Sequence, residues 1–386
     1  MRKYDIIILG AGAAGLSAAA VAVKRKKSVA VIDIGDKPGR KIAVSGGGRC
    51  NFTNMAASHN RYFGQNPNFV RSAIARIRPD DILNWVYSHN IKAFEKTPGQ
   101  WFSKDGAYKI LYALLKEICD ADLLLNTNII DIEKISDTFV IQTSEGKFAA
   151  DSVIVATGGV SYPNLVVSDI GYKIAKKFGH KIIPPCPALG PLVLKNAETD
   201  LAGISVKNVE VKVGKTIIRD DMLFTHNGVG GPAIYKASIH INNHDMTINL
   251  LPEVNVFEWL KKEKNINGKK SVSGILATKI PAKIAQSITK KSTKNIADYK
   301  DIELKEIADK VNCMYIPKGD VRHHGMATAE VTRGGVSTDK ISSKTMESEL
   351  CKKLYFAGEV LDITGDLGGF NLHWAFASGR VAGQNA

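Results

Sequence analysis

The hydrophobic pattern begins with a short apolar run that glycine ends. Residues 4–9 read Tyr-Asp-Ile-Ile-Ile-Leu, and Gly10 follows them directly. A continuous apolar run of this length is typical of a strand that is buried on both faces. The Ala-rich stretch 16–23 then predicts a helix, and residues 29–33 predict a second strand that ends in Asp33. The chain therefore opens with strand, glycine-rich turn, helix and strand.

Periodicity further along predicts a mixture of helices and strands. Apolar residues at helical spacing predict helices that begin at Pro79 and after Gly106. Short apolar or alternating runs predict strands over residues 123–130, 138–143, 147–149, 151–156, 246–251, 330–336 and 353–359. Residues 192–213 alternate as antiparallel strands do. Four prolines between residues 184 and 191 predict a break in regular structure and a domain boundary.

The turn after the first strand reads Gly-Ala-Gly-Ala-Ala-Gly over residues 10–15. In a dinucleotide site, Gly10 would allow the tight turn, Gly12 would let a pyrophosphate approach, and Gly15 would let helix and strand pack closely. The following helix offers free N–H groups to phosphates. Asp33 is placed to accept hydrogen bonds from an adenosine ribose. A glycine-rich turn without a ligand is the alternative, but the surrounding strands and helix favour a nucleotide site.

Three later stretches carry the same kind of chemistry. Residues 37–54 concentrate Gly, Ser, Asn and Arg in what we expect to be one long loop, suited to a pyrophosphate and a polar ring edge. Thr157-Gly158-Gly159 ends a predicted buried strand, where an α/β sheet binds its ligand. Gly358-Glu359 ends another, and the glycine-rich turn 367–369 opens a helix. An acid there can hold a flavin's polyol, and a helix N-terminus stabilises negative charge on a reduced flavin.

Composition limits the class of protein. No apolar run of about 18 residues is present, so we expect no membrane span, and a predicted strand so near the N-terminus leaves no room for a signal peptide. Five widely spaced cysteines, without Cys-x-x-Cys, fit a reduced cytoplasm and predict neither a disulfide framework nor a metal site.

The net charge of +14 is concentrated in one segment. Ten lysines and one acid, Glu263, lie between Lys261 and Lys294. A solvated helical surface and a nucleic-acid-facing patch are both compatible with this pattern. Few aromatic residues interleave the lysines, so the segment alone does not support stacking on single-stranded bases.

Several motifs resemble those of the bacterial flavoproteins called the aminoacetone-oxidase-like, or BaiN, family, also known as HI0933-like. They are Gly-Arg-Lys-Ile-x-x-Ser-Gly-Gly-Gly-Arg-Cys-Asn-x-Thr-Asn at 39–54, Ala-Thr-Gly-Gly-x-Ser-Tyr-Pro at 156–163, Leu-Phe-Thr-His-x-Gly-x-x-Gly-Pro at 223–232, Thr-x-Gly-Gly-Val at 332–336, Thr-Met-Glu-Ser at 345–348 and Leu-Tyr-Phe-Ala-Gly-Glu-x-Leu-Asp at 354–362. The chain departs from the family at 163–172, where two glycines are missing, and at Phe370-Asn371-Leu372-His373, where the family often has Tyr-Asn-Leu-Gln.

The resemblance implies an α/β fold with a glutathione-reductase-like, FAD-binding Rossmann domain over residues 1–190 and 337–386. It also implies an inserted β-rich domain over 191–255 and 314–336, and we expect a Lys-rich helical domain over 256–313. Carried over onto matching positions, the FAD contacts would be Gly10, Gly12, Ala13, Ala14, Gly15, Asp33, Arg40, Lys41, Gly48, Arg49, Cys50, Asn51, Ile130, Thr157, Gly158, Gly159, Gly358, Glu359, Gly369, Phe370, Asn371 and Leu372. Ile130 would contact adenine through its backbone.

The resemblance also implies an FAD-dependent oxidoreductase. The activity expected first is reduction of an activated C=C bond by hydride transfer from flavin N5, with uracil in ribosomal RNA as a suitable substrate and the segment from Lys261 to Lys294 as its contact. An amine oxidase of the aminoacetone type and an FAD-containing RNA-binding or assembly factor without turnover are the alternatives. NAD(P)H would bind only transiently, because no second nucleotide fingerprint is present. The candidate proton donors are His323 and His324 first, then Cys50, His226 and His373.

Overall fold

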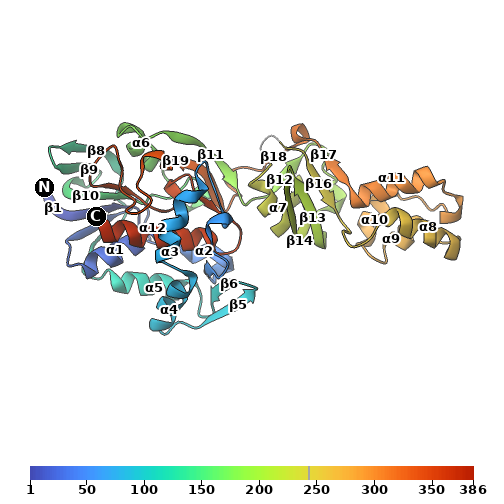
Figure 1. Ribbon diagram of the computed structural model, residues 1–386, viewed down its shortest axis with the longest axis horizontal. Coiled ribbons are helices and arrows are strands. Elements are labelled where there is room, and N and C mark those ends of the chain that lie inside the picture. The colour runs from blue at the N-terminus through green and yellow to red at the C-terminus, as the bar shows by residue number, and fades with distance from the viewer. Residues whose placement is uncertain (242–243) are drawn as a thin grey trace. The chain divides into compact units, whose positions relative to one another are not determined.

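The computed structural model describes residues 1–241 and 244–386. These residues form two compact units, each described here by itself: residues 1–186 with 331–386, and residues 187–330. The first unit thus joins the two ends of the chain (Figure 1). The finer division of the second unit into a β-rich and a helical domain remains a prediction.

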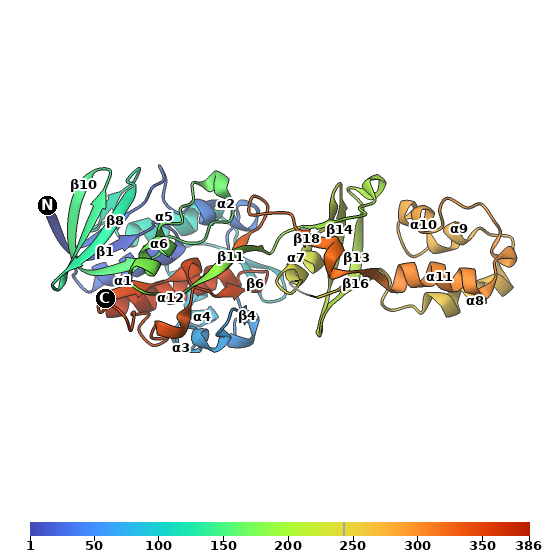
Figure 2. The ribbon, with the colours of Figure 1, turned by 90° about the horizontal axis from the view of Figure 1, so that it is seen from above.

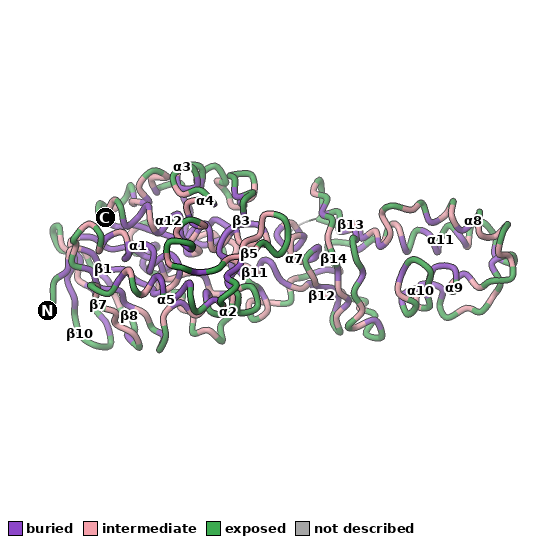
Figure 3. Tube along the Cα trace, turned by 90° about the horizontal axis from the view of Figure 1, so that it is seen from below, coloured by how far each residue is buried: buried purple, intermediate pink, exposed green. Residues whose placement is uncertain are grey.

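A seven-stranded, mostly parallel sheet is the centre of the first unit. Its strand order is β7 (Asp122–Leu124), β2 (Val29–Ile32), β1 (Arg2–Leu9), β10 (Gly146–Val155), β9 (Thr138–Thr143) and β8 (Ile129–Ile135), with β20 (Leu354–Phe356) also paired to β10. Strands β7, β2, β1, β10 and β20 run parallel to their neighbours, whereas β8 and β9 are antiparallel. Strand β2 and residues 6–9 of β1 are buried on both faces, as their unbroken apolar sequences predict, whereas the edge strand β7 is half-buried or exposed (Figure 3).

Helices and small sheets complete this unit. Helix α1 (Ala13–Lys24) packs along α12 (Phe370–Asn385), and the remaining helices are α2 (Arg40–Gly48), α3 (Arg71–Arg76), α4 (Pro79–Ser88), α5 (Ala107–Glu117) and α6 (Ile170–Lys177). The small sheets are β3 (Asn51–Asn54) with β6 (Gln100–Ser103) and β5 (Ala93–Thr97), β4 (Tyr62–Phe63) with β21 (Thr364–Gly365), and β11 (Ile182–Ala188) with β19 (Val331–Val336).

The second unit contains an antiparallel seven-stranded sheet and a group of helices (Figure 2). The strand order is β17 (Met314–Ile316), β16 (Met246–Asn249), β13 (Ser205–Val213), β14 (Thr216–Thr225), β15 (Gly228–Gly230), β12 (Leu192–Leu194) and β18 (Val321–His323). Helix α7 (Pro232–Ser238) packs on β13 and β14. Helix α8 (Val256–Ile266) packs on α11 (Asp301–Asn312), and α9 (Val272–Leu276) packs on α10 (Ala282–Ile288).

Four local predictions were wrong. Residues 37–54 are not one loop, because Arg40–Gly48 is a helix, broken at Ser45 to Gly47 where the glycines take positive φ, and Asn51–Asn54 is a strand. Residues 123–130 form the end of β7 and the start of β8, separated by a turn in which Asn126 has φ 51°. The two strands predicted over 147–149 and 151–156 are one strand, β10.

The break in regular structure predicted at the proline-rich stretch was the fourth error, although the two units do divide within this stretch, between Cys186 and Pro187. Strand β11 runs through Pro184, Pro185 and Pro187, although these prolines lack the N–H that a sheet interior needs. Because β11 belongs to a two-stranded sheet, one of its edges requires no partner and accommodates proline.

Candidate functional site

The turn between β1 and α1 gives each of its three glycines a different environment. A side chain at Gly10, which has φ +109°, would lie 2.4 Å from the Ala156 carbonyl oxygen, and one at Gly15 would lie 1.9 Å from the Gly10 carbonyl oxygen. A side chain at Gly12 would meet nothing within 4 Å. Gly10 and Gly15 are therefore required by packing. Gly12 leaves the backbone open on the side where a ligand approaches.

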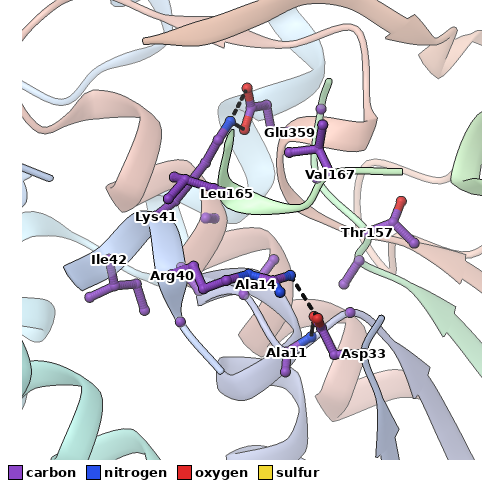
Figure 4. A pocket seen from close by; sticks show the side chains of 18 of the residues that line it. Ala11, Ala14, Asp33, Arg40, Lys41, Ile42, Thr157, Leu165, Val167 and Glu359 are labelled. Atoms are coloured by element: carbon purple, nitrogen blue, oxygen red, sulfur yellow. Dashed lines mark hydrogen bonds and ion pairs between the residues drawn. The ribbon is translucent and has the colours of Figure 1, made fainter. Parts of the chain in front are cut away.

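Asp33 holds this turn in place. Its carboxylate accepts hydrogen bonds from Ala11 N at 2.7 Å and Gly35 N at 2.8 Å, and it is ion-paired with Arg40 Nη2 at 2.8 Å (Figure 4). The other terminal nitrogen of Arg40, Nη1, is buried and has no hydrogen-bond partner within the described chain. The guanidinium thus retains a donor for an acceptor that the chain does not supply.

These residues line a cavity in the first unit, open to solvent on one side, with about 800 Å³ of empty space. The lining comes from Gly10–Ala14, Asp33, Gly39–Ile42, Ala156–Gly159, Leu165–Val167, Glu359, Asn371, Leu372 and Ala375. The cavity lies at the carboxyl ends of β1, β2 and β10, where α/β sheets bind ligands.

A polar network joins both ends of the chain across this cavity. Lys41 Nζ donates to Glu359 Oε2 at 2.8 Å and to Ser161 Oγ at 2.8 Å. Glu359 Oε1 also accepts a hydrogen bond from Thr332 N at 2.8 Å. Both charged side chains are largely buried, 32% and 19% exposed for Lys41 and Glu359. The network fixes the Glu359 carboxylate at the cavity wall.

Helix α12 reaches the cavity because it packs closely on α1. Side chains at Gly379 and Gly383 would lie 2.2 Å from the carbonyl oxygens of Ala14 and Ala18. Trp374 Nε1 donates to the Gly358 carbonyl oxygen at 3.2 Å. Only glycine allows this approach, which places Asn371 and Leu372 of α12 beside the glycine turn of α1.

The structure brings many of the predicted cofactor residues together. Those that line the cavity are Gly10, Gly12, Ala13, Ala14, Asp33, Arg40, Lys41, Thr157, Gly158, Gly159, Glu359, Asn371 and Leu372. Those that do not are Gly15, Gly48, Arg49, Cys50, Asn51, Ile130, Gly358, Gly369 and Phe370. Gly15 and Gly358 support the lining instead, since a side chain at Gly358 would lie 2.7 Å from Ala14 Cβ. The Ile130 side chain is exposed.

Cys50 and His373 are both buried away from the cavity lining. Burial raises the pKa of the Cys50 thiol to about 12. Burial also lowers the pKa of His373 to about 4, and His373 Nδ1 lies 2.9 Å from Thr53 Oγ1. Neither side chain is arranged to exchange a proton with a ligand at neutral pH.

The other candidate proton donors belong to the second unit. His323 ends β18, and His324 follows it with Nδ1 3.2 Å from Thr328 Oγ1. His226 is exposed between β14 and β15.

Sequence reasoning missed several residues at the site. Leu165, Val166 and Val167 line the cavity, and Ser161 and Thr332 fix Glu359. Leu165, Val166 and Val167 lie within residues 163–172, where the sequence departs from the motif of the family that it resembles. That departure was the one sign in the sequence that this stretch is specific to this chain. Across residues 1–241 and 244–386, no group of three or more His, Cys, Asp and Glu side chains is arranged to hold a metal, and no helix is long and apolar enough to cross a membrane.

The cavity suits an anionic dinucleotide. Helix α1 begins at Gly12 with no side-chain cap and no acid in its first turn, so its free N–H groups and positive dipole end are available to phosphates. Thr157 Oγ1 and Arg40 Nη1 are buried polar atoms without partners among the described residues. Gly158, at φ +76°, also leaves open space where a side chain would stand. The lining thus has the free backbone donors and open space that an anionic dinucleotide such as FAD requires.

Comparison with known proteins agrees with this reading. The HI0933-like protein Rossmann domain model matches residues 4–385. The chain is 40% identical to the ribosomal RNA dihydrouridine synthase of Haemophilus influenzae, over 98% of this chain and 97% of that protein, and 36% identical to that of Escherichia coli, over 100% and 98%. It is 28% identical to the 3-dehydro-bile acid delta(4,6)-reductase of Clostridium scindens, over 98% of each. The chain therefore belongs to the HI0933-like family and is an oxidoreductase with a Rossmann-type FAD-binding domain.

Proposed function

We propose that this protein reduces the 5,6 double bond of a uracil in ribosomal RNA, forming dihydrouridine. The observation that carries the proposal is whole-length identity of 36% and 40% to two proteins named ribosomal RNA dihydrouridine synthase. The bile acid reductase matches the same length at 28%. The reaction class, reduction of a conjugated C=C bond, is common to both names.

The cavity residues have distinct parts in holding FAD. The α1 N-terminus and the open backbone at Gly12 would receive the pyrophosphate. The cavity wall that contains Asp33, Arg40 and Thr157 would receive the adenosine half, and Glu359 would accept from polyol hydroxyls. The N-terminus of α12 would stabilise negative charge on the ring. When bound, FAD supplies a hydride from N5, which is the chemistry that the side chains of this fold lack.

Reduction of uracil adds a hydride to one ring carbon and a proton to the other, so the protein must supply or relay one proton. We propose His323 and His324 as the donors. Cys50 is a poor alternative because its thiol is buried in the core. His373 is also a poor alternative, because its imidazole is buried and neutral. Neither of these two buried groups has a route for replacing a lost proton.

The Lys-rich helices are the proposed contact to ribosomal RNA. Eight of the ten lysines between Lys261 and Lys294 are exposed, whereas Lys264 and Lys294 are half-buried and ion-paired with Asp301 and Glu303. Unpaired exposed lysines can neutralise backbone phosphates. We further propose a cytoplasmic location and NAD(P)H as a transient electron donor.

A small conjugated ketone or enoate is the second candidate substrate, favoured by the whole-length match to the bile acid reductase. Mass spectrometry of nucleosides from ribosomal RNA separates the two. Cells that lack the gene should lose a dihydrouridine that the wild-type gene restores. Unchanged dihydrouridine in the deletion strain would exclude RNA as the substrate and favour the small molecule.

A further inference from the structure

Two consecutive lysines form the turn that ends α10. Lys290 has φ 54° and Lys291 has φ 56°, so both lie in the left-handed region. Lys291 N donates to the Gln286 carbonyl oxygen at 2.7 Å, and Lys290 N donates to the Ser287 carbonyl oxygen at 2.9 Å. The left-handed turn is needed because it satisfies these helix-terminal carbonyls. Glycine is the usual residue there, since any other side chain is strained in this conformation.

The charged residues of the sequence stretch that contains this turn are of one sign. No acid occurs from residue 264 to residue 297, and the exposed lysines of this stretch are Lys269, Lys270, Lys279, Lys283, Lys290 and Lys291. None of these six makes an ion pair with a described residue. The stretch also contains the exposed Thr293, a residue type that commonly donates to phosphate oxygens.

Lys290 also stands at a groove within the second unit. The groove has about 1260 Å³ of empty space and is lined by parts of β12, α10, α11 and β17. Its acids already have partners: Asp320 pairs with Lys195 at 3.7 Å, Asp309 with Lys305 at 2.8 Å, and Glu198 accepts from Ser287 Oγ. Lys290 and Lys310 are the lining cations that make no ion pair with a described residue.

An aromatic side chain completes the groove. Tyr315, on β17, lines it and is 59% exposed. Its hydroxyl donates to Asp245 Oδ2 at 2.9 Å, which holds the ring in place, while the side chain as a whole remains exposed. A fixed aromatic face next to unpaired cations is the combination that binds single-stranded nucleic acid, by stacking on bases and neutralising the backbone.

We propose that the Lys290–Lys291 turn and the Tyr315 groove bind single-stranded RNA, with the lysines on successive phosphates and Tyr315 under a base. This rests on the proposed function, which makes RNA the substrate. Glycine would be less strained at both positions, so the proposal assigns the contribution of these lysines to their charge and not to the backbone conformation.

The test compares thermal stability with RNA binding. K290G/K291G should raise Tm by a few degrees, because strain is removed, while weakening binding to a fluorescent oligouridylate several-fold. The slope of log Kobs against log salt should become shallower by about 1.4, at roughly 0.7 for each lost phosphate contact. K290Q/K291Q should weaken binding equally without the gain in Tm. Y315A should weaken binding about fivefold or more and leave the salt slope unchanged.

The matched control lies in the other unit. Lys26 and Lys353 are also exposed lysines with positive φ, 60° and 64°. K26G/K353G removes the same charge and the same strain, so it should raise Tm but keep wild-type RNA affinity. Equal RNA affinity of K290G/K291G and K26G/K353G, or a wild-type protein that does not bind the oligouridylate, would overturn the proposal. Dihydrouridine formation by the wild type is measured in a separate assay. If RNA binds at this site but no dihydrouridine forms, the proposed function is overturned while the proposed RNA-binding site stands.

Discussion

Lys41 Nζ lies 2.8 Å from Glu359 Oε2, although the two residues are 318 positions apart in the chain. This ion pair joins α2 to the segment that precedes α12. Glu359 is mostly buried, so its carboxylate depends on Lys41, Ser161 and Thr332 N for compensation.

Replacing Lys41 should therefore weaken FAD binding without unfolding the chain. K41M leaves the Glu359 carboxylate short of a cation, so the carboxylate should be misplaced and FAD affinity should fall about tenfold, corresponding to roughly 1.4 kcal/mol. Titration of FAD into apoprotein, followed by flavin fluorescence, measures the effect. K41M/E359Q is the control, because it removes both charges and should recover part of the stability lost in K41M. Wild-type FAD affinity in K41M would show that the pair has no part in cofactor binding.

Gly12 and Gly15 should respond differently to the same added methyl group. G15A would place Cβ 1.9 Å from the Gly10 carbonyl oxygen, so it should destabilise the fold by roughly 2 kcal/mol or more. G12A meets only open space, so the apoprotein should keep its urea midpoint while losing FAD affinity. Urea unfolding and FAD titration of both variants provide the comparison. A G12A protein that binds FAD normally would place the pyrophosphate elsewhere.

His373 should make the protein sensitive to acid. Burial lowers its pKa from 6.5 to about 4, so the unfolded chain binds the proton more readily than the folded one. The stabilisation is complete above pH 6.5 and is lost as pH falls towards 4, a change on the order of 3 kcal/mol. H373Q, which keeps a polar side chain without the titrating ring, should flatten the pH dependence of the unfolding free energy over this window. Burial also lowers the pKa of His180, so some acid sensitivity should remain. Parallel curves for wild type and H373Q would contradict the assignment.

Cys50 should be chemically inert in the native protein. It is buried with its pKa raised to about 12, whereas Cys119 and Cys313 are exposed. A thiol reagent at pH 8 should therefore label Cys119 and Cys313 and leave Cys50 unmodified, as peptide mass mapping would show. Because the folded pKa is the higher one, the Cys50 contribution to stability is complete below pH 9 and is lost as pH rises towards 12. Rapid native labelling of Cys50 would restore it as a candidate donor.

The sequence predicted the strand, turn, helix and strand around the glycine motif because their signals are local. Strand β1, the glycine turn, helix α1 and Asp33 follow one another within a short stretch, so periodicity and glycine spacing were sufficient. The roles assigned to Gly10, Gly12 and Gly15 agree with the space around each of them.

The features of the site that the sequence did not predict depend on contacts between residues far apart in the chain. Neither the pairing of Lys41 with Glu359 nor the packing of Gly379 on Ala14 has a local signal, because each joins opposite ends of the chain. Helix α2 was missed because its glycines indicated a loop, whereas Arg40 to Val44 form a regular turn before the kink at Ser45. Strand β11 was missed for a similar reason. Its prolines indicated a break in regular structure, and only the sheet topology reveals the free edge that accommodates them.

The most direct test of the proposed reaction is a single turnover with the purified protein. The flavoprotein is reduced anaerobically, mixed with ribosomal RNA from the deletion strain, and followed both by flavin absorbance and by nucleoside mass spectrometry. We predict reoxidation of the flavin together with about one dihydrouridine per flavin. Reduced flavin that persists in the presence of this RNA, with no dihydrouridine formed, would contradict the proposed reaction.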